Sequence, residues 1–409
     1  MKKPKLVIVG LGMAASRLLD ELVKSNAQQD YDIVVFGEEL VGGYNRILLS
    51  HVLSGEQTID AIVSHDQTWF EQQQIRWFSG RKVIHIDTHG KQLTDATGGV
   101  HSYDRLVLAT GSLPVRAEVP GNQLAGVFSF RDVLDAQQLL ALKANAGRVL
   151  VVGAGLLGLE AAYGLVKQGL SVTVVHRSDR IMSQQLDHAA ASLLQAQLAS
   201  LGIEFVLSAQ LLEIVGETKV TGVRLTNGDT LAAQAVVMAM GIRPNIRLAQ
   251  DSGLKVQRGV VVDDCCRTSA QDVYALGECS ECQGHTYGLV APIYRQVSVL
   301  VNQLMGDATM RFRHEETPTQ LKVSGITLFS FGSPLASDEA QVLCYQHPKQ
   351  QWYRKVILDA QHRVIGAVML GNTQASQAVF QRYLSAEPLA KHERALLALG
   401  QLARVSEGV

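Results

Sequence analysis

The sequence predicts an α/β protein with two parallel-sheet domains and a smaller α+β domain at the carboxyl end. Three observations predict this fold class. A glycine-rich strand–turn–helix–strand unit occurs twice, each copy is followed by a late apolar strand, and the pattern becomes β-rich after about residue 312. The chain has 409 residues, more than a single hydrophobic core usually accommodates, which favours two or three domains.

The first unit begins at the amino terminus. Apolar periodicity and glycine punctuation predict a strand, a turn, a helix and a strand at residues 5–9, 10–15, 16–24 and 32–36. In such a turn the first glycine permits the bend, the second lets a phosphate approach the backbone, and the third position must be small. These three positions are held by Gly10, Gly12 and Ala15. We therefore expect a nucleotide pyrophosphate at the amino end of this helix, where free N–H groups point outward.

The second unit repeats this order. Its strand, glycine turn, helix and strand are predicted at residues 148–152, 153–158, 159–167 and 171–175, with Gly153, Gly155 and Gly158 in the turn. Two complete copies in the same context are a much stronger indication of nucleotide binding than one glycine motif alone. Each copy is expected to form a Rossmann-like domain.

The residues after the second strand of each unit differ between the copies. Glu38 follows the first copy and can accept hydrogen bonds from ribose hydroxyls, although a solvated loop acid beside Glu39 is an alternative. The second copy has no acid there, because Val175 is followed by His176 and Arg177. These side chains would not repel a 2′-phosphate, so the sequence leaves NADPH open and makes a strict NADH preference doubtful.

Each unit is closed by a later apolar strand that ends in small residues. The first, residues 103–108, leads into Ala109, Thr110 and Gly111, and its counterpart at 235–239 leads into Met240 and Gly241. A further strand at 272–276 ends in Gly277 and Glu278. We expect these turns to lie beside the glycine loops, because the carboxyl ends of parallel strands meet at one edge of a sheet.

The domain boundaries follow from these elements. Strand-like stretches at 322–329, 352–358 and 364–370 and a helical tail from Gln374 form the third region, with a hairpin over 359–363. The expected domains are a first, discontinuous nucleotide-binding domain, a second nucleotide-binding domain and a carboxyl-terminal α+β domain. Their expected ranges are 1–115 with 245–311, 116–244, and 312–409.

Composition excludes several classes of protein. A formal net charge of −1 provides no electrostatic footprint for nucleic acid or an anionic membrane. The apolar stretch 149–166 contains four glycines and reads as a strand, turn and helix of a domain core, so we expect no membrane span. The start of the chain does not resemble a secretion signal, and five cysteines do not form a secreted disulfide framework, which favours a cytoplasmic location.

The cysteines raise one alternative. Cys279 and Cys282 have the spacing of a redox or metal pair, but two cysteines are half of a zinc or cluster site, and Cys265 and Cys266 complete it only if a turn brings them close. We therefore expect no metal site. The segment 40–50 has no cysteine, so a redox disulfide of the glutathione reductase type is not expected.

With these motifs, the chain resembles the FAD-dependent pyridine-nucleotide reductases over essentially its full length. Several stretches are more specifically similar to the flavoprotein portion of assimilatory NAD(P)H nitrite reductases, with rubredoxin and ferredoxin reductases as near relatives: residues 44–50, 185–187, 287–292 and 321–326. The resemblance implies that the first glycine loop holds FAD and the second holds NADH or NADPH as the electron donor.

The resemblance also implies which residues contact each nucleotide. For FAD they are Gly10, Gly12, Met13, Ala14, Ala15, Glu38, Arg46, Ser50, Ala109, Thr110, Gly111, Arg131, Gly277, Glu278 and Pro292. For NAD(P)H they are Gly153, Gly155, Leu156, Leu157, Gly158, Glu160, His176, Arg177, Met240 and Gly241. Pro292 is expected to open a helix over 293–305 whose positive end faces the flavin.

Two residues are expected near the reacting rings. Glu160 is predicted beside the nicotinamide, with an acid in the first helical turn as an equally open interpretation. Related reductases pair this glutamate with a lysine, where this chain has His51, so a His51–Glu160 pair and a solvated His51 both remain open. No catalytic triad is expected, because hydride transfer needs stacked rings and exclusion of water.

The function implied is an FAD-dependent NAD(P)H oxidoreductase that passes electrons to a redox protein. The resemblance makes the sirohaem component of nitrite reductase, in nitrate assimilation, the leading acceptor. The chain stops before the iron–sulfur and sirohaem domains of that family, so we expect it to be the electron-input component. A rubredoxin or ferredoxin reductase is the alternative enzyme, and an NADH-binding redox sensor is an alternative of another class. A homodimer formed through the third domain is compatible with the resemblance.

Overall fold

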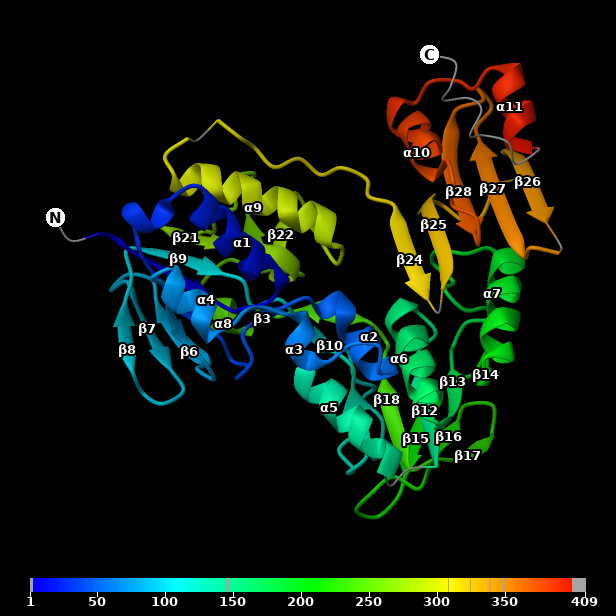
Figure 1. Cartoon of the computed structure of the whole chain (residues 1–409), viewed down its shortest axis with the longest axis horizontal. Coiled ribbons are helices and arrows are strands. Elements are labelled where there is room, and N and C mark those ends of the chain that lie inside the picture. The colour runs from blue at the N-terminus through cyan, green and yellow to red at the C-terminus, as the bar shows by residue number, and fades with distance from the viewer. Residues whose placement is uncertain are drawn as a thin grey trace.

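The structure is a computed structural model that describes residues 3–144, 147–307, 309–323, 325–337, 339–347 and 349–398. Three bodies are visible in Figure 1: one around α1 (Met13–Lys24) and α9 (Val290–Leu304), a second around β12 (Arg148–Val152) and α6 (Leu156–Lys167), and a third formed by the chain from β24 (Thr319–Val323) onward. The described part of the chain begins in the first body and ends in the third (Figure 1).

The first body is built on a five-stranded parallel sheet in the order β21-β9-β1-β2-β5. Its strands are β1 (Lys5–Val9), β2 (Asp32–Phe36), β5 (Arg76–Phe78), β9 (Arg105–Leu108) and β21 (Val273–Ala275). The strands of this sheet therefore come from two parts of the sequence, one before and one after the residues that form the second parallel sheet. Such a sheet, covered on both faces, needs apolar residues at successive positions, which explains the unbroken apolar run of β1.

Helices cover one face of this sheet and a small antiparallel sheet covers the other. Helices α1 (Met13–Lys24) and α9 (Val290–Leu304) lie side by side and share one core with Leu6 and Ile8 (Figure 1). The opposite face, with Val7 and Val9, packs against the sheet of β6 (Val83–Asp87), β7 (Gln92–Asp95) and β8 (Val100–Ser102).

The second body repeats this plan. Its parallel sheet has the order β11-β18-β12-β13-β14, formed by β11 (Val127–Ser129), β12 (Arg148–Val152), β13 (Ser171–Val175), β14 (Ile203–Val206) and β18 (Ala235–Met238). One face packs against α5 (Val133–Ala141), α6 (Leu156–Lys167) and α7 (His188–Ser200). The other packs against the antiparallel strands β15 (Leu211–Val215), β16 (Gly222–Leu225) and β17 (Thr230–Ala232).

The internal repeat predicted from the glycine motifs is confirmed by the local strand order. In the first sheet β1 lies between β9 and β2, and in the second β12 lies between β18 and β13. In both sheets the strand that opens the unit is therefore central, with its glycine loop at the carboxyl edge.

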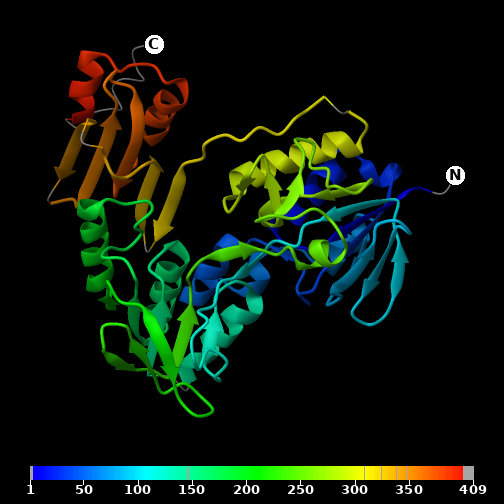
Figure 2. The same cartoon turned by 180° about the vertical axis from the view of Figure 1, so that it is seen from behind.

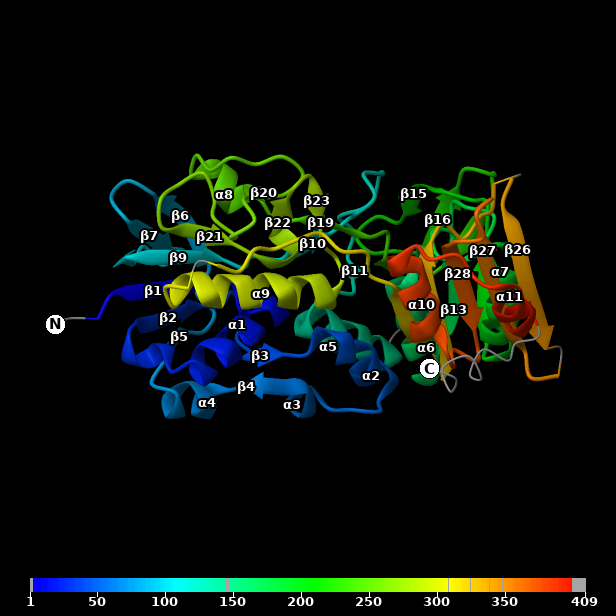
Figure 3. The ribbon, with the colours of Figure 1, turned by 90° about the horizontal axis from the view of Figure 1, so that it is seen from above.

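Two antiparallel strands connect these bodies. Strand β10 (Ser112–Pro114) pairs with β19 (Ile242–Pro244), so the outgoing and returning segments of the chain run next to each other. Figure 3 shows β10 and β19 at the junction of the two bodies. Thr110 adds a hydrogen bond from its hydroxyl to the carbonyl of Asn245, 2.9 Å long.

Shorter elements complete the first body. They are β3 (Gly43–Tyr44), α2 (Leu49–Ser54), α3 (Ile59–Ile62), β4 (Val63–His65), α4 (Gln67–Gln72), α8 (Arg247–Asp251), β20 (Val260–Val262), β22 (Ser280–Cys282) and β23 (His285–Thr286). Helix α2 reaches the second body, because Gly164 of α6 packs against Leu53 and the Gln168 side chain donates to the Leu53 carbonyl.

The third body is a five-stranded antiparallel sheet in the order β24-β25-β28-β27-β26. Its elements are β24 (Thr319–Val323), β25 (Ile326–Gly332), β26 (Gln341–His347), β27 (Trp352–Leu358), β28 (Val364–Leu370), α10 (Ser376–Ser385) and α11 (Lys391–Ala398). Phe329 faces α10, whereas its neighbour Leu328 joins the core of the second body. This alternation lets one face of the sheet cover its own helices and the other dock on α6 and α7. Figure 2 shows the extended segment 309–318 that leads from α9 to β24.

The predicted bounds of several strands and helices need correction. The stretch 322–329 is two strands joined by a turn at Gly325, whose positive φ of 83° suits glycine, and Ser324 lies outside the described residues. Helix α9 begins at Val290, before Pro292, because proline is tolerated in a first turn whose N–H groups lack helical partners. The tail forms two helices, and residues 399–409 lie outside the described part of the chain.

Within the residues described above, no helix combines the length and apolarity that crossing a membrane requires. All five cysteines are free thiols.

Candidate functional site

One large cavity lies at the carboxyl edges of both parallel sheets. It has a volume of about 2000 Å³ and is lined by residues that end strands of both, including Val9, Phe36, Val152 and Val175. Pockets for one drug-sized ligand are typically about 300–1,000 Å³, so this cavity has room for more than one nucleotide-sized group. Open α/β sheets bind ligands at this edge.

The first glycine loop is shaped by close backbone contact. Gly10 has a φ of 103°, and a Cβ there would lie 2.2 Å from the carbonyl oxygen of Ala109. Gly12 caps α1 without a side-chain hydrogen bond, and the first turn has no acidic residue. A Cβ at Gly12 would meet only the Arg46 Nε atom, at 3.8 Å. The helix therefore presents free N–H groups to open space, as an anionic ligand requires.

The second glycine loop has the same geometry. Gly153 has a φ of 116° and would place a Cβ 2.2 Å from the Ala239 carbonyl oxygen. Gly155 caps α6 without a side-chain acceptor, and no atom lies within 4 Å of a Cβ built there. Both loops therefore fit a pyrophosphate group in the same way.

The third small residue of each loop serves packing. A Cβ at Gly158 would lie 2.0 Å from the Gly153 carbonyl oxygen, and Ala15 is fully buried. Neither residue lines the cavity. The two residues let helix and strand approach closely, which is the reason that the motif demands small side chains there.

Most of the expected contact residues line this cavity. From the set expected around FAD they are Gly10, Gly12, Met13, Ala14, Glu38, Arg46, Ala109, Thr110, Gly111, Arg131, Gly277 and Glu278. From the set expected around NAD(P)H they are Gly153, Gly155, Leu156, Leu157, Glu160, His176, Arg177, Met240 and Gly241. The expected residues that do not line it are Ala15, Ser50, His51, Gly158 and Pro292.

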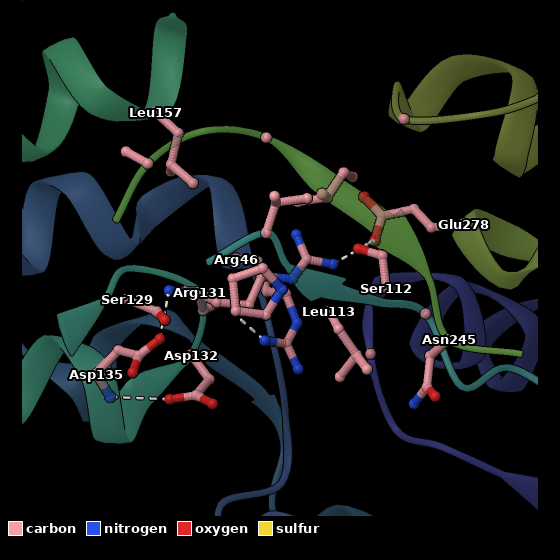
Figure 4. A pocket seen from close by; sticks show the side chains of 18 of the residues that line it. Arg46, Ser112, Leu113, Ser129, Arg131, Asp132, Asp135, Leu157, Asn245 and Glu278 are labelled. Atoms are coloured by element: carbon pink, nitrogen blue, oxygen red, sulfur yellow. Dashed lines mark hydrogen bonds and ion pairs between the residues drawn. The ribbon is translucent and has the colours of Figure 1, made fainter. Parts of the chain in front are cut away.

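Two arginine–glutamate pairs occupy the middle of the cavity. Arg131, which follows β11, forms an ion pair with Glu278, and the Ser112 hydroxyl donates to the same carboxylate over 2.8 Å (Figure 4). Arg46 pairs with Glu39, donates to the Arg131 carbonyl over 2.9 Å, and lies 4.9 Å from the centre of the Tyr44 ring. These contacts hold both guanidinium groups in fixed positions beside the first glycine loop.

Three residues of this network were missed in the sequence. Glu39 and Ser112 had no assigned role, and Asp135 accepts a hydrogen bond from the Arg131 backbone over 2.7 Å. Burial, and then the nearby Asp132 carboxylate, raise the pKa of Asp135 to about 6. The Asp132-x-x-Asp135 spacing at a helix start was a local signal for the cap, because Asp132 accepts from the Asp135 N–H. The contacts of Glu39 and Ser112 had no local signal.

Glu38 lies at the rim of the same cavity. Its carboxylate forms an ion pair of 2.6 Å with Lys82, and both side chains are exposed. An exposed pair of this kind is weak and easily opened, so the pair leaves Glu38 accessible to a ribose.

His176 and Arg177 stand at the end of β13. The His176 Nδ1 atom accepts a hydrogen bond of 3.2 Å from the backbone N–H of Ala154 in the glycine loop. Burial, and then the positive charge of Arg177, lower the pKa of His176, which keeps the ring neutral. Nε2 then carries the proton, and it is buried without a partner in the described structure. The exposed Arg177 guanidinium forms no ion pair with any described residue.

Glu160 lies on α6, close to the second loop. Its carboxyl group is half-buried in the cavity wall, and burial raises its pKa to about 7. The His51 Nε2 atom lies 3.8 Å from Glu56 Oε2, and no described residue forms an ion pair with Glu160. The pairing of His51 with Glu160 therefore stays a prediction.

Comparison with known proteins gives matches along most of the chain. The family model for pyridine nucleotide-disulphide oxidoreductases matches residues 4–303, and the model for the rubredoxin NAD+ reductase C-terminal domain matches residues 318–385. A nitrite reductase [NAD(P)H] of Bacillus subtilis is 40% identical over 380 residues, which cover 93% of this chain and 47% of that protein. The chain thus spans about half the length of this relative.

Two further matches extend the comparison. The nitric oxide reductase FlRd-NAD(+) reductase of Klebsiella pneumoniae is 34% identical over 305 residues, covering 74% of this chain and 79% of that protein. The crystal structure of a ferredoxin reductase from Rhodopseudomonas palustris superposes with a TM-score of 0.85 at 25% identity, covering 98% of this chain and 100% of that one.

The raised pKa of Glu160 predicts a pH-dependent stability. The folded protein binds this proton more tightly than the unfolded chain does. The bound proton therefore contributes to the free energy of unfolding at low pH, and this contribution is lost as pH rises through about 7. Glu160→Gln should remove this loss, and the variant should gain stability over the native protein by roughly 1 kcal/mol or more between about pH 5 and about pH 8. Urea unfolding of both proteins across that range checks it. A difference between the two that does not change with pH would contradict the shift.

Proposed function

The chain belongs to the pyridine nucleotide-disulphide oxidoreductase family, and on this premise we propose that it supplies electrons from NAD(P)H, through FAD, to the sirohaem component of a nitrite reductase. At the coarser level it is an NAD(P)H flavin oxidoreductase of the nitrite reductase and rubredoxin reductase group. The observation that carries the proposal is the single cavity shared by two glycine loops of the same geometry.

The first loop is assigned to FAD. Gly12 leaves open space at the start of α1, and Arg46, Arg131 and Glu278 provide charged groups around it. FAD supplies a group that takes a hydride from the donor and passes on electrons. The surrounding residues bind and orient it, through free N–H groups at α1 and through guanidinium groups already held by Glu39 and Glu278.

The second loop is assigned to the donor nucleotide. Gly155 leaves open space at the start of α6, and Glu160 lies on the same helix, facing the cavity. With the two loops in one cavity, the reacting rings of the two nucleotides can lie between them. We propose that the Glu160 carboxyl group, whose pKa burial raises to about 7, hydrogen-bonds the carboxamide of the donor there.

The domain boundaries follow the junction strands. We propose a discontinuous FAD-binding domain of residues 1–115 and 245–311, a donor-binding domain of residues 116–244, and a carboxyl-terminal domain from residue 312. The paired strands β10 and β19 support this division, because they carry the chain across at residues 112–114 and 242–244.

The acceptor is proposed from the relatives. The nitrite reductase of B. subtilis supports nitrite reduction. The assimilatory nitrate reductase electron transfer subunit of the same organism, 38% identical over 384 residues, supports a role in electron transfer. The match of residues 318–385 to the rubredoxin NAD+ reductase C-terminal domain favours a rubredoxin or ferredoxin reductase as the second candidate.

The two glycine positions separate the two nucleotide sites. In Gly12→Val the branched side chain fills open space rather than striking the fold, so the protein should remain folded but purify without bound flavin. In Gly155→Val the protein should keep its yellow flavin, which NAD(P)H no longer reduces. Flavin absorbance and rapid mixing with NAD(P)H measure both effects. Normal reduction of the Gly155 variant would show that the sites are misassigned.

The end of β13 predicts use of NADPH. The exposed guanidinium of Arg177, which pairs with no described residue, offers donors to a 2′-phosphate where an acid would repel it. Replacing His176 by Glu and Arg177 by Leu should therefore lower the rate with NADPH relative to NADH by about tenfold or more. Flavin reduction rates with each donor measure this ratio. An unchanged ratio would remove both residues from the selection of the donor.

The identity of the electron acceptor is tested by mixing the reduced protein with candidate acceptor proteins. The protein, reduced by NAD(P)H, should transfer electrons rapidly to a separately purified sirohaem nitrite reductase subunit and support nitrite reduction there. Rapid transfer to rubredoxin alone would replace the nitrite assignment with the second candidate. Flavin reduction slower than roughly once per second would instead favour a redox sensor, since common enzymes turn over faster.

A further inference from the structure

The loop from His176 to Asp187 joins β13 to α7 and forms one wall of the proposed donor site. Met182, Ser183, Gln184 and Gln185 of this loop line the cavity. Its backbone is tied to the second glycine loop, because the Met182 N–H donates to the Ala154 carbonyl over 2.9 Å. Any displacement of this segment would therefore move the wall of the site.

Arg180 organises the same loop from within. Its guanidinium donates to the carbonyl of Leu186 over 3.1 Å and to the carbonyl of Ser183 over 3.0 Å. Met182 adopts a left-handed backbone conformation with a φ of 49°, which an L-residue holds only when its surroundings impose it. The loop is thus a compact turn whose geometry depends on where its two ends are fixed.

Asp187 fixes the carboxyl end of this loop. One carboxylate oxygen caps α7 by accepting the Ala190 N–H over 3.0 Å. The other accepts from the Tyr353 hydroxyl over 2.6 Å and from the Lys355 ammonium over 2.9 Å. Burial alone would raise the pKa of Asp187, but the hydrogen bonds from Tyr353 and Lys355 outweigh it and hold the pKa below its usual value.

Tyr353 and Lys355 belong to the third body. Both are on β27, two residues apart and so on the same face of the sheet, and Lys355 also donates to the Pro334 carbonyl over 3.1 Å. The Asp187 and Lys355 side chains are 9% and 11% exposed, so this contact is shielded from water. Leu328, Val368 and Leu370 pack into the core of the second body around it. In Figure 1, β27 and β28 lie next to one end of α7.

We propose that Tyr353 and Lys355 are positioning residues for the donor nucleotide, acting through Asp187 on the loop 176–187. The carboxyl-terminal domain then completes the donor site without touching the nucleotide. This inference rests on the proposed function, because it takes the second glycine loop as the donor site. By thermodynamic reciprocity, donor binding also strengthens the docking of this domain on the second body.

A buried charge contact fits this role better than apolar packing would. Apolar surfaces tolerate small sliding movements, whereas an anion that accepts two donors in a dry environment fixes their relative positions, and breaking it leaves a buried charge uncompensated. The cap to α7 and the contact to β27 use different oxygens of one carboxylate, so the helix start and the domain contact move together.

The test compares donor affinity in matched variants. Tyr353→Phe and Lys355→Met should each raise the dissociation constants of NADP+ and NAD+ by about threefold or more, as expected for coupled sites. Isothermal titration of the purified holoprotein measures these constants. The flavin content should equal that of the native protein. Tyr345→Phe is the control, because it removes a hydroxyl from the neighbouring strand β26 that makes no bond to Asp187.

A double variant that removes both charges tests whether nucleotide binding is restored. Asp187→Asn keeps a good helix cap but removes the charge, so the double variant Asp187→Asn with Lys355→Met should bind nucleotide more tightly than Lys355→Met alone. Native-like dissociation constants in both Tyr353→Phe and Lys355→Met, with a lowered thermal midpoint, would overturn the proposal and leave a contact that only docks the domain.

The same titration separates this inference from the proposed function. If Gly155→Val binds NADP+ and NAD+ as the native protein does, the donor site is elsewhere, and both the function assignment and the inference fail. If Gly155→Val loses binding while the Tyr353 and Lys355 variants keep it, the function assignment stands and only the inference fails.

Discussion

The site depends on one backbone constraint that occurs twice. In each parallel sheet, a glycine with positive φ brings the end of the first strand against the carbonyl of the neighbouring late strand, Gly10 against Ala109 and Gly153 against Ala239. This approach turns the chain directly into a helix whose amino end faces the carboxyl edge of the sheet. A side chain at either glycine would separate the strands, and the helix would no longer point its free N–H groups into the cavity.

The positions of the charged groups in the cavity depend on these two strand–glycine–helix turns. The Arg131–Glu278 pair joins residues 147 positions apart, and the Arg46–Glu39 pair lies beside it through the bond from Arg46 to the Arg131 carbonyl. Both pairs neutralise charge within a partly enclosed space, where an unpaired guanidinium would pay a large desolvation cost. An anionic nucleotide would meet cations that are already desolvated and held in place, so the network prepares the site for its ligand.

The local sequence pattern predicted the strands and glycine loops well, but it did not predict the side-chain contacts of the cavity and of the third body. The strands 5–9, 32–36, 148–152 and 171–175 occur at the predicted bounds, because apolar runs between glycines leave few alternatives. The small residues at positions 15 and 158 were recognised, although they serve packing and do not line the cavity. By contrast, the partners of Ser112 and Asp187 come from segments 166 positions away in the chain. Such contacts exist only once the chain is folded, and no periodicity or spacing encodes them.

The paired strands β10 and β19 have a consequence for how such a chain can arise and be rebuilt. Because the chain leaves the first body and returns to it along hydrogen-bonded neighbours, the whole second body has its two ends side by side. A segment with adjacent ends can be inserted into a host, or removed and replaced by a short turn, without breaking the host sheet. Gene insertion thus offers a direct route to the internal repeat. The same junction is a natural place to exchange the second body for another unit of the same kind.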